Sequence, residues 1–304
     1  MRNALARIAI AGSLIAAGIT IPTPAPAMAS MSGVKVVIIV GPVGSLTDDY
    51  RSRGNRVADV AQAAGATVVK VYSPRATWAR VLDAVRGANV IVYFGHGNGY
   101  PNPYSGTELK DRDNGWGLNR TTSHGDKDDW SRTMVYCGER ALLGRLGSSD
   151  GAAQRRYCKG GPIRPAADFV MIYGQAHYTP GFGERYSRSD PRTTYYQARQ
   201  RVRNYSYPVL RLGASAFFAS AYSDADRLLA RLFANPRSGF GWAFRQGRGY
   251  DADALRTSAH PDLDARIWVQ KTVIDGFHFS QPDYWYAFAG NPSLTPHRAG
   301  LDGS

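Results

Sequence analysis

The sequence predicts an α/β fold, a three-layer α/β/α sandwich in which helices cover both faces of a mainly parallel sheet. The first buried run, Val34–Val40 (VKVVIIV), is almost entirely apolar and β-branched, as in a strand that is covered on both faces. Similar runs then alternate with amphipathic helical segments as far as Phe233, and this alternation favours βαβ units with parallel strands. A chain of 304 residues, 43% of them hydrophobic, is long enough to bury such a core.

Glycine and proline residues mark the ends of the predicted elements. Strands are expected at 34–40, 67–72, 89–94, 168–173 and 213–220, and helices at 50–64, 74–86, 134–146, 193–210 and 225–233. Together they form one predicted domain, residues 30–235. Residues 236–304 are rich in Gly, Trp, Tyr and Phe, and we expect an irregular aromatic extension packed on the same core, with short strands near 266–273.

The first 29 residues have the pattern of a secretory signal peptide. Arg2 and Arg7 precede or flank an apolar stretch at 8–21, and Ala27-Met28-Ala29 is typical of a cleavage site. The stretch is shorter than the ~20 apolar residues that a membrane span needs. The sequence therefore predicts a secreted protein, cleaved near Ala29, without a membrane span.

Export affects how the two cysteines are interpreted. In an oxidising compartment, Cys137 and Cys158 are expected to form a disulfide. The alternative is that one of them is a free nucleophile.

The formal net charge is +13, and it falls to +11 when Arg2 and Arg7 are removed with the signal peptide. A basic protein favours anionic partners, here an anionic cell-wall polymer, anionic lipid or nucleic acid. The arginines form no long run, so solubility of a basic secreted protein is the favoured explanation of the charge, and nucleic acid is the less favoured partner.

Three glycine-containing turns are expected to meet at the carboxyl ends of the predicted strands, where open parallel sheets bind ligands. They are Gly41–Ser45, Gly95–Gly99 and Gly174–Gly183. In the second turn, His96 stands between Gly95 and Gly97 and is followed by Asn98. The glycines permit a sharp bend that leaves the imidazole accessible, and a histidine so placed is suited to proton transfer near neutral pH.

A strand that ends in Tyr93-Phe94-Gly95-His96-Gly97, followed by the apolar strand at 169–173, resembles the caspase-like superfamily. This superfamily includes caspases, legumains, gingipain-like peptidases and bacterial CHAT domains. Tyr136-Cys137-Gly138-Glu139 and the ending Tyr284–Pro292 are similar to segments of secreted bacterial proteins of unassigned function. The resemblance implies that His96 acts as a base and that a nucleophilic cysteine follows the next strand.

That cysteine is missing, because residues 169–184 contain none. We expect Ala176 to occupy its position, and alanine cannot supply the thiolate. Two substitutes remain open. Cys137 could approach His96 if the long loop folds back, and Thr179 could act as an alcohol nucleophile, although Thr179-Pro180 is more typical of a turn.

The sequence also leaves a metal site open. His177 is expected opposite His96, and the two could share zinc with Glu139, Glu184 or His124. Asp111, Asp113, Asp126, Asp128 and Asp129 supply oxygen atoms that could suit calcium. No spacing corresponds to a known metal signature, so unrelated polar loop residues are the favoured interpretation, and no cofactor is predicted.

The leading hypothesis is a secreted caspase-like protein that has lost its nucleophile, a pseudoenzyme that binds a peptide or polymer at the His96 turn. The alternative is an active hydrolase that uses His96 with Cys137, Thr179 or a metal shared with His177. A third hypothesis is a binding module for anionic polymers. Whether the protein is an enzyme stays open at this stage, because a fold does not determine a function.

Overall fold

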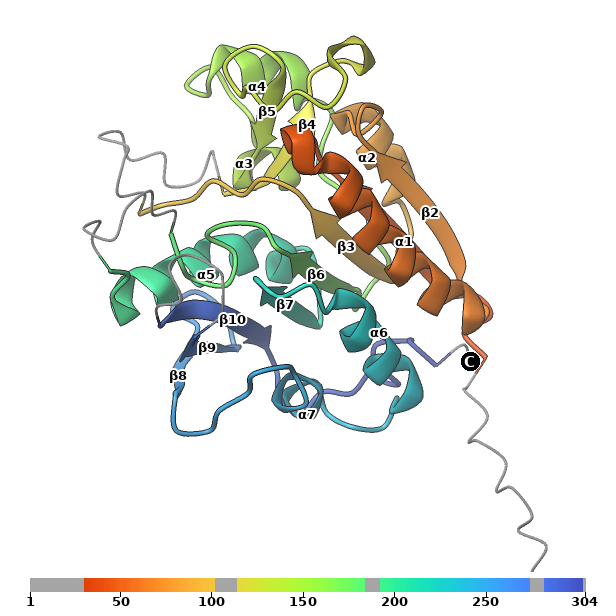
Figure 1. The fold of residues 1–304 in the computed structure, drawn as a ribbon, viewed down its shortest axis with the longest axis vertical. Coiled ribbons are helices and arrows are strands. Elements are labelled where there is room, and N and C mark those ends of the chain that lie inside the picture. Colours follow the sequence, from red (N-terminus) through yellow and green to blue (C-terminus); the bar gives the residue numbers. More distant parts are fainter. Residues whose placement is uncertain (1–29, 102–113, 184–191, 274–281, 303–304) are drawn as a thin grey trace, which may run out of the picture.

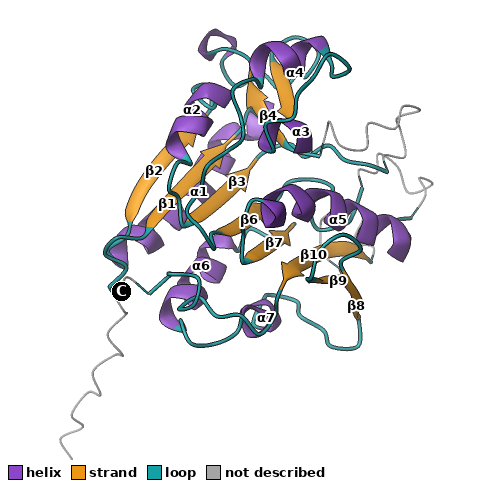
Figure 2. Ribbon diagram, turned by 180° about the vertical axis from the view of Figure 1, so that it is seen from behind, coloured by secondary structure: helices purple, strands orange, loops and turns teal. Residues whose placement is uncertain are grey.

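In the computed structural model, an eight-stranded sheet lies between two layers of helices (Figures 1 and 2). The structure describes residues 30–101, 114–183, 192–273 and 282–302. The predicted signal peptide, residues 1–29, lies outside the described residues. The three-layer α/β/α arrangement confirms the fold class that the strand and helix pattern predicts.

The sheet has a parallel half and an antiparallel half. Its strand order is β2-β1-β3-β6-β7-β10-β9-β8. The first five strands in that order pair in parallel, and the last three pair antiparallel. Their bounds are β1 (Lys35–Val40), β2 (Thr67–Tyr72), β3 (Val90–Phe94), β6 (Val170–Gly174), β7 (Ala216–Ser220), β8 (Leu255–Ala259), β9 (Arg266–Thr272) and β10 (Asp283–Gly290).

Each face of the sheet is covered by its own set of helices. One face carries α1 (Thr47–Ala63), α6 (Ala225–Ala234) and α7 (Phe240–Arg245). The other carries α2 (Trp78–Ala84), α3 (Glu139–Leu142), α4 (Ala152–Tyr157), α5 (Tyr195–Arg211) and a small hairpin of β4 (Trp116–Asn119) and β5 (Met134–Cys137). Alternate residues of β1 belong to the two cores, because successive side chains of a strand point to opposite faces. Two short 3-10 helices, η1 (Gly44–Leu46) and η2 (Thr122–His124), lie in loops.

Two regions differ from the sequence-based expectation. The predicted helix at 134–146 is wrong, because Met134–Cys137 pairs antiparallel with Trp116–Asn119 and only Glu139–Leu142 is helical. The tail after residue 236 is more regular than expected, since it contributes α7 and three strands to the sheet. Its aromatic residues are packed inside: Phe244 stacks on Tyr286 with ring centroids 4.2 Å apart.

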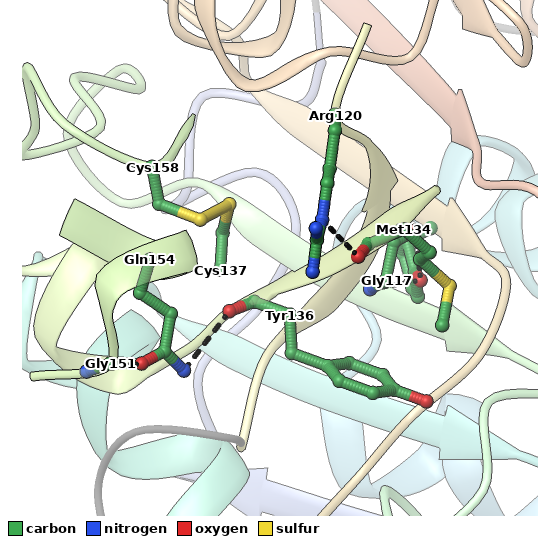
Figure 3. The surroundings of a disulfide bond; sticks show 9 residues. Gly117, Arg120, Met134, Tyr136, Cys137, Gly151, Gln154 and Cys158 are labelled. Carbon is green, nitrogen blue, oxygen red and sulfur yellow. Dashed lines mark hydrogen bonds between the residues drawn. A yellow bond between two sulfur atoms is a disulfide. The ribbon is translucent and has the colours of Figure 1, made fainter. Parts of the chain in front are cut away.

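The predicted disulfide is present and joins β5 to the end of α4 (Figure 3). Cys137 and Cys158 are both fully buried, with their Cα atoms 5.4 Å apart. Beside them, the amide of Gln154 donates to the carbonyl oxygen of Tyr136 at 3.4 Å. The disulfide therefore fastens the β4–β5 hairpin to α4. Across the four described ranges, no helix is long and apolar enough to cross a membrane.

Candidate functional site

The bends that follow β3 and β6 lie side by side at the carboxyl end of the sheet. β3 and β6 are parallel neighbours, with Phe94 opposite Gly174. The bends touch: a Cβ atom on Gly97 would clash with the carbonyl oxygen of His177. Glycine is required at position 97 because this close approach leaves no room for a side chain. The turn after β1 joins them, since the Gly41 amide donates to the Phe94 carbonyl oxygen at 2.8 Å.

The side chain of Tyr93, a residue of β3, supports the His96 bend. Its hydroxyl donates to the carbonyl oxygen of His96 at 2.7 Å and accepts from the Gly117 amide at 2.8 Å. Burial raises the pKa of this phenol well above its usual range, so the hydroxyl stays protonated and can donate. A Cβ atom on Gly95 would clash with the same hydroxyl, and one on Gly41 would clash with the carbonyl oxygen of Gly117, which explains why both positions lack a side chain.

Helix α5 holds the other end of the same loop by its backbone. Three buried side chains of the helix donate hydrogen bonds to three backbone carbonyl oxygens of this loop. They are Tyr205 Oη to Asn98 at 2.7 Å, Asn204 Nδ2 to Tyr100 at 2.9 Å and Arg201 Nε to Pro101 at 2.8 Å. Arg201 also donates to the carbonyl oxygen of Gly181 at 2.9 Å, so this helix ties together the loops that follow β3 and β6.

The imidazole of His96 faces a carboxylate. His96 Nε2 lies 3.4 Å from Asp128 Oδ2, and the two side chains are 30% and 49% exposed. The loop that carries Asp128 is fixed by Asp126, whose carboxylate accepts from Arg51 at 2.6 Å and from Ser73 at 2.8 Å. Its backbone also accepts from Gly44 at 2.9 Å. We call His96 and Asp128, with the bends that hold them, the His96 site.

This pair is suited to proton transfer or to recognition of a hydrogen-bonding group. A carboxylate beside an imidazole orients the ring by accepting a hydrogen bond from it. Both side chains are partly exposed, so a ligand can reach them. Sequence reasoning missed the pairing, because Asp128 lies 32 residues after His96 in a loop for which unrelated polar residues are the favoured interpretation, with calcium as the alternative.

The second bend buries most of its side chains. Ala176 is fully buried in the core beneath α5, whereas His177 is partly exposed and packs its ring 5.2 Å from that of Phe182. Gln175 and Tyr178 have φ angles of 56° and 66°, a left-handed conformation that is uncommon for residues with side chains. The backbone therefore turns sharply on either side of the Ala176-His177 pair.

Neither substitute nucleophile is available next to His96. Both cysteine sulfur atoms are used in the Cys137–Cys158 disulfide, so Cys137 carries no thiol. The Thr179 hydroxyl is fully buried and donates to the Ala176 carbonyl oxygen at 2.7 Å. This hydrogen bond closes the turn, as the Thr-Pro sequence suggests.

The carboxylates and histidines do not gather into a metal site within the described residues. No group of three or more His, Cys, Asp or Glu side chains forms there. Glu139 begins α3, and its negative charge helps to raise the pKa of Arg203. His124 Nδ1 lies 3.3 Å from the Thr121 hydroxyl. Glu184, Asp111 and Asp113 lie outside the described residues.

The calcium candidates point to separate partners. Asp126 pairs with Arg51, and Asp128 with His96. Hydrogen bonds from Ser131, with Arg132 beside it, lower the pKa of Asp129 to about 2. The remaining predicted residue of the first turn, Ser45, is exposed on η1.

Comparison with known proteins identifies no relative. No family model matches the chain, and no curated protein or solved structure is significantly similar to it. The function must therefore be inferred from the His96 site itself.

Proposed function

We propose that this chain is a secreted caspase-like pseudoenzyme that binds an extended peptide at the His96 site without cleaving it. One observation carries the proposal: the parallel pairing of β3 and β6 brings the His96 bend against a bend that carries no thiol. The superfamily that the sequence resembles requires a histidine after one strand and a cysteine after the next. The first half of this arrangement is supported by the geometry, and the second half is missing.

The side chains of the second bend support a lost nucleophile under either alignment. Caspases carry a Gln-Ala-Cys run at the nucleophile, and Gln175-Ala176-His177 would then place His177 at the position of the cysteine. The partial exposure of His177 favours this position over Ala176, whose side chain is buried in the core. Neither alanine nor an imidazole can form the thioester of a cysteine peptidase.

The surroundings of His96 favour a peptide over an anionic polymer. Asp128 places a partly exposed carboxylate beside His96, and its negative charge would repel phosphate or uronate groups. Leu46 and Trp130 are 56% and 65% exposed, and each lies two residues from a residue of the site or its supporting loops. Exposed aromatic side chains such as Trp130 are typical of protein-binding surfaces.

The first experiment measures binding and cleavage together. We expect the purified protein to bind members of a labelled peptide library, with no turnover above that of the His96→Ala variant. Asp128→Asn should weaken binding by about tenfold, because removing a charged hydrogen-bond partner costs roughly 1.5 kcal/mol. Asp264→Asn, a matched change at an exposed carboxylate after β8, should leave binding unchanged. Hydrolysis that disappears in His96→Ala would refute the proposal and favour an active hydrolase.

A labelling experiment tests which residue of the second bend is accessible from solvent. His177→Cys should react with iodoacetamide in the folded protein, whereas Ala176→Cys should react only after unfolding, because position 176 is fully buried. The native disulfide provides no competing thiol. Faster reaction at position 176 than at position 177 would contradict the orientation of this bend.

A further inference from the structure

The outer strand β2 presents an unpaired edge with a groove beside it. β2 is the first strand in the sheet order and pairs only with β1 among the described strands (Figure 1). A groove of about 470 Å³ runs along residues 69–75 and is walled by Arg80, Asp83 and Ala84 of α2. The groove lies at the side of the sheet and shares no residue with the His96 pair.

The backbone of β2 offers hydrogen-bonding groups along this edge. The amides of Thr67 and Ser73 donate toward β1, to Val34 and Val40 at 2.8 and 2.7 Å. In a parallel pair, the amides of successive residues point alternately toward the partner strand and away from it. The amides of Val68, Lys70 and Tyr72 therefore face away from β1. The run TVVKVY is mostly β-branched, as expected of a strand that pairs well on both sides.

The usual protection of an edge strand is weak here. Natural proteins often place a lysine on an edge to block pairing with another chain. Lys70 is such a lysine, but its ammonium group donates to Asn55 on α1 at 2.9 Å and so is held against the chain's own helix. The opposite edge strand, β8, is covered in part by α5: Arg199 donates to the Ser258 hydroxyl at 2.9 Å and to the Ala259 carbonyl oxygen at 3.2 Å.

The groove carries an excess of positive charge. Arg75 and Arg80 line it, against a single carboxylate from Asp83, and all three residues are exposed, whereas the Lys70 ammonium group is directed to α1 on the other face of the sheet. We propose that this groove binds an extended, acidic segment of a partner protein, which adds to β2 as a further strand of the sheet. Backbone hydrogen bonds supply the affinity in such strand addition, and the charges select the sequence. A second copy of this chain fits less well, because its own β2 edge brings the same positive charges.

The experiment uses a fluorescein-labelled synthetic peptide of alternating valine and glutamate and the unmodified protein. Two altered peptides serve as controls, one with lysine in place of glutamate and one with alternate amides N-methylated so that they cannot pair with a strand. We expect saturable binding of the acidic peptide, and at least about tenfold weaker binding of both controls. Hydrogen exchange should slow at the amides of Val68 and Lys70 when the acidic peptide is bound.

Charge reversal in the protein gives an independent test. Arg75→Glu combined with Arg80→Glu should weaken binding at least about tenfold. Arg227→Glu combined with Arg237→Glu, on and after α6, makes the same change in net charge and should alter binding by less than about twofold.

Three results would overturn the proposal. One is the absence of saturable binding. Another is equal affinity for the N-methylated peptide, which would mean that charge alone holds the ligand. The third is a dimer of the chain that protects the amides of Val68 and Lys70 without peptide, which would assign the groove to a second copy. None of these results depends on the outcome at His96, so the two proposals fail separately.

Discussion

Replacing Tyr93 by phenylalanine tests whether the hydroxyl beneath the His96 bend holds that bend in place. The hydroxyl makes two short hydrogen bonds, to the His96 carbonyl oxygen and from the Gly117 amide. A typical hydrogen bond contributes about 1 kcal/mol to stability. The Gly117 amide keeps a second acceptor, the His96 carbonyl oxygen at 3.2 Å, which reduces the loss. We therefore expect Tyr93→Phe to lower the free energy of unfolding by about 1 to 2 kcal/mol.

Urea denaturation followed by tryptophan fluorescence measures this loss. Tyr196→Phe is the matched control, because Tyr196 is 77% exposed and its hydroxyl can bond to water. The imidazole resonances of His96 should shift in Tyr93→Phe and stay in place in Tyr196→Phe. If the two variants were equally stable, or if the His96 resonances did not move, the support that we assign to Tyr93 would be refuted.

Two further predictions concern the contact between the bends and the pH dependence of stability. Gly97→Ala should destabilise the protein by about 2 kcal/mol or more, since the added methyl group would clash with the His177 carbonyl oxygen. In the control Gly147→Ala, the nearest atom to the added methyl group is 3.7 Å away, and the loss should be less than about 1 kcal/mol. Equal losses in thermal unfolding would contradict the close approach of the two bends. Burial lowers the pKa of His260 to about 4, below the value of about 6.5 in an unfolded chain, so protonation favours the unfolded state. The contribution of His260 to the free energy of unfolding is complete above pH 6.5. It is lost as the pH falls toward 4, and the loss reaches up to about 3 kcal/mol. Denaturation at several pH values should show that the difference between the wild type and His260→Gln changes across this window, and a constant difference would argue against a buried neutral imidazole.

The parallel half of the sheet and the position of His96 could be predicted because both depend on local sequence. β3 and β6 are continuous apolar runs that end at Gly95 and Gly174, and the glycines on either side of His96 indicate a bend. The parallel connection then requires both bends to lie at the same end of the sheet. No contact with a distant residue is needed for these inferences.

The partners of His96 could not be predicted because they come from elsewhere in the chain. Asp128, Tyr205 and Arg201 reach the site from a loop and a helix, and no motif links them to the Gly-His-Gly run. The β4–β5 hairpin was missed for a related reason. Each strand has only four residues, and the apolar positions of 134–146 also have helical spacing, so the pairing with residues 116–119 decided the outcome.

The attachment of α5 to the loop after β3 has a consequence for engineering and for evolutionary drift. Its donors contact peptide oxygens at Asn98, Tyr100 and Pro101, and every amino acid carries such an oxygen. These bonds therefore place no demand on which side chains the loop displays. A library randomised at Asn98 and Tyr100 should keep the loop anchored to the helix while it presents new chemistry next to the imidazole.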